Sequence, residues 1–365
     1  MKVLHIEAGK SLFGGAKQVV YLMNGLAKHN IENMLVCPTG SDIASEVGAF
    51  NSPLMQVQAT KMTGDLDIGF IFRLRSILKT WRPDVVLCHS RRGADVFGLI
   101  AAKLCKIPVI CVRRVDNTEA HWLAKLKYEA FSKTVCISKA IENVLLEQGV
   151  APEACEVIRS VIDTNEYTPQ APNTYLQKEF GFTEQNLVIG CFAQLIERKG
   201  QANLLRAFKQ VHAQFPNSRL LICGKGKKRQ EYEALCHELG LQDAVVFAGF
   251  RTDVANLLPQ LDVLAHPAFT EGLGVTLMQA SACGLPIVAT KAGGIPEVVI
   301  NDLNGLLIPI DDEASLIESL NALLGSKEQR ETYAKNGREF VLNNCSIDSM
   351  VNGYLALFKR LAISR

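Results

Sequence analysis

Short apolar runs alternate with longer amphipathic stretches along almost the whole chain, and this pattern limits the fold more than any other feature. It is typical of βαβ units, whose parallel strands are covered by helices on both faces. A chain of 365 residues is too long for one ordinary domain and comfortable for two. We predict an α/β protein with two Rossmann-like, doubly wound parallel-sheet domains facing a cleft. Ligands of such sheets bind at the carboxyl ends of strands, so we expect the chemistry in that cleft.

The expected strands form two series, separated by a polar segment. That segment, roughly Asp163 to Asn186, contains two prolines and predicts the linker between the domains. Strands of the first series are expected at Val3–Glu7, Asn33–Cys37, Val85–Cys88, Val109–Val112 and Thr134–Ile137. Those of the second series are expected at Leu187–Phe192, Arg219–Cys223, Ala244–Ala248, Val263–His266, Pro286–Ala289 and Gly305–Ile308.

Charge is unevenly distributed along a chain whose net charge is only +2. Between Arg73 and Lys133 there are thirteen Lys and Arg against five Asp and Glu, which indicates either an anionic partner or a solvated basic face. The eleven cysteines lie mostly in apolar runs without metal-ligand spacing, as expected of buried thiols. The chain has no run of 18 apolar residues and begins with a short strand pattern, so we expect a cytoplasmic protein.

The stretch EGLGVTLMQASACGLPIVATKAGGIPEVV, which begins at Glu271, carries the most information about function. Glu271 is followed by Gly272, Leu273 and Gly274, and then by a helix-like run that closes at Gly284. Glycines at the start of a helix allow backbone N–H groups to approach a phosphate, which the helix N-terminus also attracts. Glu271 could accept hydrogen bonds from hydroxyl groups. Phosphate together with hydroxyls indicates a nucleotide sugar as the ligand.

Other motifs follow one another in a fixed order along the chain: FGGA (13–16), VVLCHSRRGAD (85–95), ISKAIENVLLEQGV (137–150), AQLIERKG (193–200) and GFRTDV (249–254). With this set the chain resembles the family 4 retaining glycosyltransferases of the GT-B fold, also described as group 1, over nearly its whole length. The resemblance implies transfer of a hexose-like sugar from a nucleoside diphosphate sugar to an acceptor hydroxyl, with retention at the anomeric carbon. It implies an acceptor-binding domain over residues 1–165, a donor-binding domain over 166–345 and a C-terminal helix over 346–365 that crosses back to the first domain.

The resemblance assigns donor binding to residues of the second domain. Lys199 matches the lysine that contacts the donor diphosphate, where its charge would stabilise the leaving group. Glu271 would contact the donor sugar near the reacting carbon, and with Lys199 and His89 it forms the predicted catalytic set. The other implied donor contacts are Gly272, Leu273, Gly274, Val275 and Thr276 at the diphosphate, Gln194 and Gln279 beside it, and Phe250 and Arg251 at the nucleobase. Without the resemblance, Glu271 could cap a helix and the turn at Phe250 could be an ordinary βα connection.

Two positions of the donor domain depart from the family pattern. Gln194 stands where the family commonly has an arginine, and Gln279 stands where it has a glutamate that binds the ribose hydroxyls. An amide hydrogen-bonds more weakly than a charged group. These departures leave open a non-catalytic nucleotide-sugar-binding protein. A nucleotide-sugar epimerase of the same architecture is a second alternative.

In the first domain, the resemblance places Gly14 and Gly15 over the donor phosphates and beside the acceptor site. His89 ends a strand pattern and matches the histidine that reaches toward the donor sugar, although such a residue is otherwise often structural. Arg113 and Arg114 also end a strand pattern and could hold an anionic acceptor. With the local basic excess they favour a glycan or glycolipid acceptor such as lipopolysaccharide core.

Two features could be mistaken for functional motifs. Residues 70–82 (FIFRLRSILKTWR) mix bulky apolar and basic side chains at helical spacing, which fits a helix packed on the sheet better than peripheral contact with an anionic membrane. Asp65 and Asp67 resemble the acidic pair of metal-dependent glycosyltransferases, but they precede a helix pattern and are better explained as helix caps. We expect no metal, no cofactor beyond the donor substrate, and no nucleic-acid partner.

Overall fold

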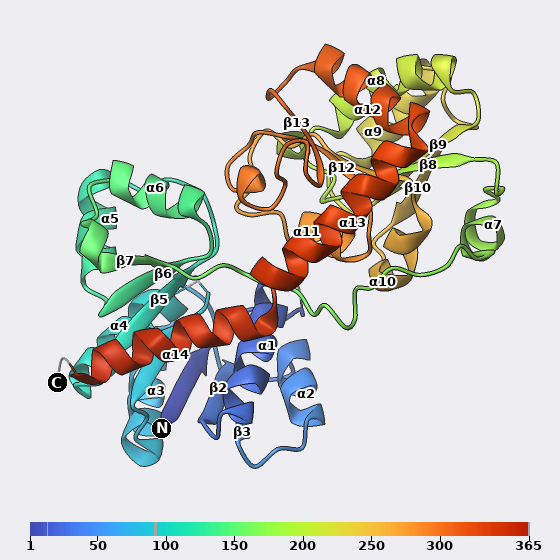
Figure 1. The fold of residues 1–365 in the computed structure, drawn as a ribbon. Coiled ribbons are helices and arrows are strands. Elements are labelled where there is room, and N and C mark those ends of the chain that lie inside the picture. The colour runs from blue at the N-terminus through green and yellow to red at the C-terminus, as the bar shows by residue number, and fades with distance from the viewer. Residues whose placement is uncertain (13, 91–92, 364–365) are drawn as a thin grey trace. The chain divides into compact units, whose positions relative to one another are not determined.

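The computed structural model describes residues 1–12, 14–90 and 93–363, and divides the chain into two compact units. The first contains residues 1–161 together with the C-terminal helix α14 (Ile347–Ile363), and the second contains Ile162–Ser346 (Figure 1). Each unit is a parallel sheet covered by helices on both faces. The predicted α/β class with two Rossmann-like sheets is confirmed. Among the described helices, none is both long and apolar enough to cross a membrane.

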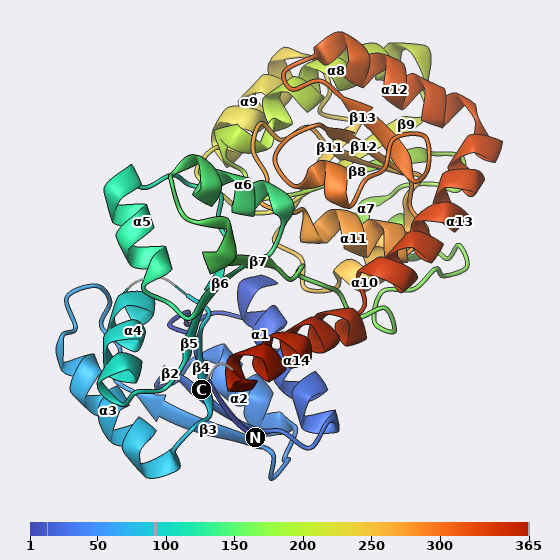
Figure 2. The ribbon, with the colours of Figure 1, turned by 60° about the vertical axis from the view of Figure 1, so that its left-hand side comes forward.

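The first unit contains a parallel sheet with the strand order β3-β2-β1-β4-β5-β6-β7. Its strands are β1 (Lys2–Ile6), β2 (Glu32–Pro38), β3 (Met55–Thr60), β4 (Val85–Cys88), β5 (Val109–Arg113), β6 (Lys133–Cys136) and β7 (Cys155–Val157). Its helices, besides α14, are α1 (Gly14–Lys28), α2 (Asp42–Ala49), α3 (Gly69–Trp81), α4 (Ala94–Leu104), α5 (His121–Glu129) and α6 (Lys139–Glu147). Helices α1, α2 and α14 lie on one face of the sheet, and α3, α4 and α5 lie on the other (Figure 2).

The second unit contains a parallel sheet with the strand order β10-β9-β8-β11-β12-β13. Its strands are β8 (Leu187–Phe192), β9 (Ser218–Cys223), β10 (Val245–Gly249), β11 (Val263–His266), β12 (Ile287–Thr290) and β13 (Gly305–Ile308). Its helices are α7 (Tyr175–Phe180), α8 (Gln201–Gln214), α9 (Arg229–Glu238), α10 (Val254–Leu257), α11 (Val275–Ala282), α12 (Glu313–Gly325) and α13 (Lys327–Asn344). Aliphatic side chains of β8, β9 and β11 pack against α8 and α12 to form the main core.

In both sheets the strand order reverses next to the first strand of the unit. The reversal falls between β1 and β4 in the first sheet and between β8 and β11 in the second. At such a point the connections on either side leave in opposite directions, and a crevice opens at the carboxyl ends of the two strands. Each unit therefore has one position at which its fold favours a ligand site.

The edge strands β3 and β7 are absent from the predicted set. Gln56 and Gln58 alternate with apolar residues in β3, and β7 has only three residues, so neither reads as an apolar run. Both lie at the ends of the sheet, where a strand has one neighbour and need not be apolar on both faces.

The segment predicted as the linker, Asp163–Asn186, is structured in the computed fold. The segment belongs to the second unit and contains α7, and its Tyr167, Leu176 and Phe182 are buried. The polar residues and prolines between these side chains hide the apolar pattern in the sequence.

The helix predicted at residues 70–82 packs on the sheet as expected, because Phe70, Leu74 and Leu78 of α3 are buried. Asp67 is used in the turn before α3. Its carboxylate accepts hydrogen bonds from Arg73 at 2.7 and 2.8 Å and from the Thr63 amide at 3.0 Å. These contacts support the structural interpretation of the acidic pair.

Candidate active site

Lys199, His266 and Glu271 come together where the strand order of the second sheet reverses. Lys199 ends a short helical turn after β8, His266 is the last residue of β11, and Glu271 lies in the loop that leads to α11. Lys199 Nζ lies 2.6 Å from Glu271 Oε2, and His266 Nε2 lies 3.0 Å from the same oxygen. The Gly272 amide donates to the other oxygen, Oε1, at 3.0 Å. The carboxylate is thus held by three donors, one from the end of β11 and two from the adjacent loops.

Burial and charge act in opposite directions on Glu271. Burial raises the pKa of a carboxyl group because it removes water from the charged form. The hydrogen bond from His266 and the charge of Lys199 outweigh this effect and hold the pKa of Glu271 well below its ordinary value. Glu271 is therefore a carboxylate at neutral pH, and its partner Lys199 is only 8% exposed. This cluster can bind hydroxyl groups and a phosphate side by side.

The loops around the cluster touch one another backbone to backbone. A Cβ on Gly200 would lie 1.9 Å from the Pro267 carbonyl oxygen, and a Cβ on Gly293 would lie 2.0 Å from the Glu271 carbonyl oxygen. Both glycines also have a positive φ. Only glycine fits these positions, because any side chain would push the loops apart. The sequence thus fixes the spacing between Lys199 and Glu271.

Helix α11 begins directly beside the carboxylate. Its N-cap is Gly274, with φ 89°, which has no side chain to cap the first-turn amides. The amides of Val275 and Thr276 therefore point out of the helix start, and both residues are partly exposed. A helix N-terminus next to a buried ammonium group is suited to a diphosphate.

The remaining predicted donor residues have different environments. Gln194 is exposed, and its carbonyl oxygen accepts a hydrogen bond from the Gln201 amide at 2.9 Å. Gln279 is partly exposed in α11 and hydrogen-bonds with Tyr167. Phe250 is 53% exposed, and Lys225 Nζ lies 5.0 Å from the centroid of its ring.

The Arg251 side chain forms hydrogen bonds with residues of α7 and of its own loop. Its guanidinium donates to Asp253 at 2.7 and 2.9 Å, to Glu179 at 2.7 Å and to the Tyr175 hydroxyl at 2.8 Å. These hydrogen bonds, above all that to Asp253, raise the pKa of Arg251. The structure therefore occupies the Arg251 guanidinium with side chains of its own unit.

In the first unit, His89 lies at the reversal between β1 and β4 and is 3% exposed. Its Nε2 lies 3.0 Å from His5 Nδ1, and its Nδ1 lies 3.3 Å from Arg114 Nη2. His5 Nε2 in turn lies 3.0 Å from Asn33 Oδ1. Burial lowers the pKa of His89 well below its ordinary value and that of His5 to about 4, so both rings are neutral at pH 7. Both ring nitrogens of His89 are thus used within this unit.

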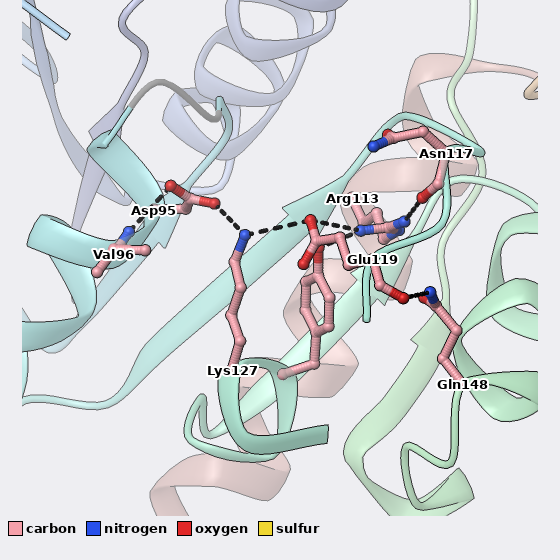
Figure 3. A network of polar contacts seen from close by, with 8 residues as sticks. Asp95, Val96, Arg113, Asn117, Glu119, Lys127 and Gln148 are labelled. Atoms are coloured by element: carbon pink, nitrogen blue, oxygen red, sulfur yellow. Dashed lines mark hydrogen bonds and ion pairs between the residues drawn. The ribbon is translucent and has the colours of Figure 1, made fainter. Parts of the chain in front are cut away.

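The adjacent arginines at the end of β5 have opposite surroundings. Arg113 donates to the Tyr128 hydroxyl and the Asn117 carbonyl, and its Nη1 lies 3.6 Å from Glu119. Lys127 Nζ lies 3.5 Å from Glu119 Oε1 and 2.7 Å from Asp95 Oδ2. Positive and negative side chains therefore alternate in a buried row (Figure 3). Arg113 is therefore held inside the unit.

Arg114 instead contacts neutral groups, namely His89 and the Ser160 hydroxyl at 3.3 Å. Within the described residues its Nε is buried without a hydrogen-bond partner. Its Cδ would lie 3.6 Å from a Cβ on Gly15, so it borders the start of α1 at Gly14 and Gly15. A cavity of about 230 Å³ opens beside it, lined among others by Glu7, His89, Asp95, Arg114 and Tyr128. Phe13, Arg91 and Arg92 of the neighbouring motifs lie outside the described residues.

His266 and Lys225 are functional candidates that the sequence analysis missed. His266 follows the apolar run of β11 and precedes Glu271 by five residues, and a polar side chain at such a strand end is a usable signal. Lys225 lies in a Gly-Lys-Gly turn after β9, where the same signal applies.

We expect His266→Leu to lower kcat for sugar transfer roughly tenfold, because Glu271 Oε2 loses one hydrogen-bond donor to a charged group. His266→Gln, whose amide can donate from a similar position, should keep most of the activity. Steady-state kinetics with the donor varied would separate kcat from the donor KM. Equal losses in the two variants would mean that His266 serves packing alone.

Two Rossmann-like parallel sheets, each with a reversal of strand order beside its first strand, give the chain the architecture of the GT-B class. The family profile described as "Glycosyltransferase Family 4" matches residues 13–166, and that described as "Glycosyl transferases group 1" matches residues 174–340. The chain belongs to the group 1 glycosyltransferases.

Curated relatives support this assignment over different lengths. The lipopolysaccharide core biosynthesis glycosyltransferase LpsD of Rhizobium meliloti is 26% identical over 99% of this chain and 98% of its own. A GDP-mannose-dependent phosphatidylinositol monomannoside mannosyltransferase of Corynebacterium glutamicum is 35% identical, but the match spans 51% of either chain. The chain thus matches about half the length of this second relative.

Solved structures share the fold over the whole chain. A glycosyltransferase from Rickettsia africae superposes with a TM-score of 0.88 at 16% identity, covering 99% of this chain and 98% of that one. Anabaena Alr3699/HepE, in complex with UDP and glucose, gives a TM-score of 0.86 at 20% identity, covering 99% and 100%. These likenesses confirm the predicted GT-B fold.

Proposed function

We propose that this chain transfers a hexose-like sugar from a nucleoside diphosphate sugar to a hydroxyl of a glycan or glycolipid, such as lipopolysaccharide core. The observation that carries the proposal is the Lys199–His266–Glu271 cluster beside the N-terminus of α11. It offers a cation and backbone amides for the diphosphate, and a carboxylate for sugar hydroxyls. The match to LpsD spans nearly the full length of both chains, and LpsD is named for lipopolysaccharide core biosynthesis. This match supports a lipopolysaccharide core glycan as the acceptor.

As the bond between sugar and phosphate breaks, negative charge grows on the departing diphosphate. Lys199 Nζ would leave Glu271 Oε2 for a phosphate oxygen, and the Val275 and Thr276 amides would donate to the same group. Glu271 would keep its hydrogen bonds from His266 and Gly272 and accept from a hydroxyl of the sugar. Retention at the anomeric carbon is part of the proposal because the chain resembles a retaining family, in which the departing phosphate takes the acceptor proton on the same face.

The proposed reaction needs no metal ion, because Lys199 and the helix N-terminus supply positive charge where metal-dependent transferases use a cation. In the described part of the chain, no group of three or more His, Cys, Asp or Glu side chains could hold a metal. Transfer in buffer with excess EDTA, at the rate seen without it, is the expected result.

The direct test is incubation of the purified chain with a panel of nucleoside diphosphate sugars and a lipopolysaccharide core acceptor, with the product detected by mass spectrometry. We expect product only when donor and acceptor are both present. Conversion of the donor into a nucleotide sugar with a different sugar, in the absence of the acceptor, would indicate an epimerase. Donor binding without turnover under any of these conditions would indicate a non-catalytic nucleotide-sugar-binding protein.

Arg114 is the residue we propose for binding an anionic acceptor, because Arg113 is already neutralised by Glu119. Arg114→Gln should raise the acceptor KM about tenfold, the value of one hydrogen bond to a charged group, and leave the donor KM unchanged. Lys28→Gln, at the exposed end of α1, is the matched control. If the acceptor KM were unchanged in the Arg114 variant and raised in the control variant, Arg114 would not be part of the acceptor site.

Peripheral contact with an anionic membrane is proposed for the face formed by α3, α4 and α5 (Figure 2). Phe72, Trp122 and Leu126 are each about two-thirds or more exposed there, and Ile100 and Leu104 of α4 are also exposed. The same helices carry the exposed basic residues Lys79, Lys103 and Lys125. An apolar surface with basic residues around it is suited to anionic lipid.

We expect the chain to cosediment with vesicles of phosphatidylglycerol and to bind vesicles of phosphatidylcholine much less. Trp122→Ser with Leu126→Ser should lower the bound fraction severalfold, because two exposed apolar side chains are removed from the bilayer interface. The matched control is Leu342→Ser, which replaces an exposed leucine of α13 in the second unit. An equal bound fraction for both variants would argue against this face.

A further inference from the structure

A cavity of about 450 Å³ lies at the amino edge of the second sheet, away from the catalytic cluster. It is lined by α7, by the loop that leads from α7 to β8, and by Asp262, the residue before β11. Asp262 and His266 lie at opposite ends of β11, so at about 3.3 Å per residue they are roughly 13 Å apart. A small ligand in this cavity would therefore lie outside the Lys199–His266–Glu271 cluster.

The walls of the cavity are tied to the body of the second unit. The Asn173 amide donates to Gln260 Oε1 at 3.0 Å, and Gln260 Nε2 donates to the Ala171 carbonyl at 3.3 Å. On the opposite side, Asn186 Nδ2 donates to the Asn217 carbonyl at 3.0 Å. The cavity is therefore formed before a ligand arrives, as is usual for small-molecule sites, which measure roughly 300–1,000 Å³.

The floor of the cavity is apolar. It is formed by side chains that are almost completely buried, namely Leu176, Phe182, Val188 and Leu261. Such a floor is stabilised by contact with carbon–hydrogen surface, because water is then removed from both. A ligand of this cavity is thus expected to have one apolar face.

One carboxylate oxygen of Asp262 has no hydrogen-bond partner among the described residues. Its Oδ2 accepts from the Val188 amide at 2.8 Å, whereas Arg330 Nη2 lies 3.8 Å from Oδ1, which is beyond hydrogen-bond distance. Arg330 Nη1 instead donates to the carbonyls of Leu323 and Leu324 at 2.7 and 3.0 Å. Burial raises the pKa of Asp262, so a donor placed at Oδ1 would stabilise the charged form.

The rim of the cavity carries further polar side chains that can bind a ligand. Thr174, Gln177 and Glu184 are exposed, and within the described residues their side chains form no hydrogen bond or ion pair. No lysine or arginine is among the residues that line the cavity, all of which the structure describes. An anionic ligand would face two carboxylates, Asp262 and Glu184, whereas a ligand with several hydroxyl groups would find acceptors for them.

We infer that this cavity is a second, non-catalytic saccharide site, which binds a neutral sugar unit through Asp262, Gln177 and Glu184. A sugar ring has hydroxyl groups around its rim that donate to carboxylate and amide oxygens. Its carbon–hydrogen face can lie against Leu176 and Phe182. The site holds one sugar unit of a glycan at a distance from the catalytic cluster, and it does not depend on the function proposed above.

The test is saturation-transfer-difference NMR of the chain with D-glucose, D-galactose and D-mannose, repeated with an excess of UDP or GDP. We expect at least one of these hexoses to bind, and its signal to persist with either nucleotide. The uronate of that hexose, which has a carboxylate in place of the terminal hydroxyl, should bind at least about fivefold more weakly, because its charge meets two carboxylates. A signal that UDP or GDP abolishes would place the hexose in the nucleotide-sugar site and overturn the inference.

Substitutions in the cavity locate the bound hexose. Asp262→Asn should weaken it about tenfold, the value of one hydrogen bond to a charged group, and the amide oxygen can still accept from the Val188 amide. Gln177→Trp, at an exposed position of α7, should abolish binding by filling the cavity, and it remains a test if the Asp262 variant does not fold. Glu318→Gln replaces an exposed carboxylate of α12 outside the cavity and is the matched control, with unchanged binding.

Three results would overturn the inference. The first is that none of the three hexoses binds, and the second is that a hexose binds equally well to the Gln177→Trp variant. The third is that putrescine binds more tightly than any hexose and Asp262→Asn removes this binding, which would identify a site for cations.

The failure of this inference is distinct from the failure of the proposed function. If the chain transfers sugar from a nucleotide sugar but binds no hexose at this cavity, only the second saccharide site is overturned. If a hexose binds and Gln177→Trp removes it, in a chain that transfers no sugar, the second site is supported and the proposed transferase activity is not.

Discussion

Replacement of Lys199 by methionine is expected to lower kcat/KM for sugar transfer by about a hundredfold to a thousandfold. Methionine keeps most of the length of the side chain and lacks the ammonium group with its charge and its three donors, so the departing diphosphate loses its nearest cation. Removing one preorganised donor to a developing anion costs about this much in other enzymes. Gln194 brings no charge that could replace the ammonium. Steady-state kinetics at saturating acceptor would measure the loss.

Lys227→Met is the matched control, since Lys227 is an exposed lysine of the same unit. It should transfer sugar at the unaltered rate. Titration with a nucleoside diphosphate should show weaker binding to the Lys199 variant only. A Lys199 variant with near-normal kcat/KM would show that the diphosphate is stabilised by other groups.

Replacement of Glu271 by glutamine is expected to reduce both activity and stability. The amide cannot balance the buried ammonium of Lys199, so we expect a kcat below the unaltered value by about a hundredfold, and a free energy of unfolding that is also lower. The stability loss should stay below the roughly 3–5 kcal/mol of a fully buried pair, because the Glu271 side chain is 18% exposed. Urea unfolding of both proteins at pH 7 would measure the difference.

The same pair of proteins has a predicted pH dependence. The folded-state pKa of Glu271 lies below its unfolded value, so its stabilisation is fully present above about pH 5 and is lost as the pH falls toward the folded-state pKa. The difference in unfolding free energy between unaltered protein and Glu271→Gln should therefore shrink on acidification from pH 7 to pH 3. A difference that grew over this range would contradict the ionised, lysine-paired carboxylate.

The fold could be predicted from sequence where strands are short runs dominated by apolar residues. The bounds of β4, β8, β11 and β13 agree with the predicted ones, and each of these strands is mostly apolar. The edge strands β3 and β7 and the short helix α7 could not, since each buries only part of its surface and mixes polar residues into the pattern. The tertiary contacts that bury Tyr167 and Phe182 leave no periodic signal in the chain.

The candidate site could be predicted only in part, for a similar reason. Lys199 and Glu271 are 72 residues apart, and the motifs around them predicted a shared ligand that the 2.6 Å contact now supports. The pairing of Arg251 with Glu179 could not be foreseen, because it depends on α7 lying nearby. His89 was expected to face a ligand, yet both its ring nitrogens are used by His5 and Arg114. Its role as a catalytic residue stays a prediction.

The adjacent arginines show the same limit. Arg113 and Arg114 are equivalent in the sequence, and only the structure shows that one faces Glu119 and the other contacts His89 and Ser160. Alternating charges on separate elements, such as Asp95, Lys127 and Glu119, cannot be paired from spacing alone.

Binding of the donor diphosphate by Lys199 and the N-terminus of α11 can be tested with a crystal structure of the chain with a bound nucleoside diphosphate, either UDP or GDP. We expect a phosphate oxygen within hydrogen-bond distance of the Val275 or Thr276 amide, and another within reach of Lys199 Nζ. Lys199 should then have moved away from Glu271 Oε2, while His266 Nε2 stays on it. A diphosphate bound elsewhere, with the contact between Lys199 and Glu271 intact, would contradict the account.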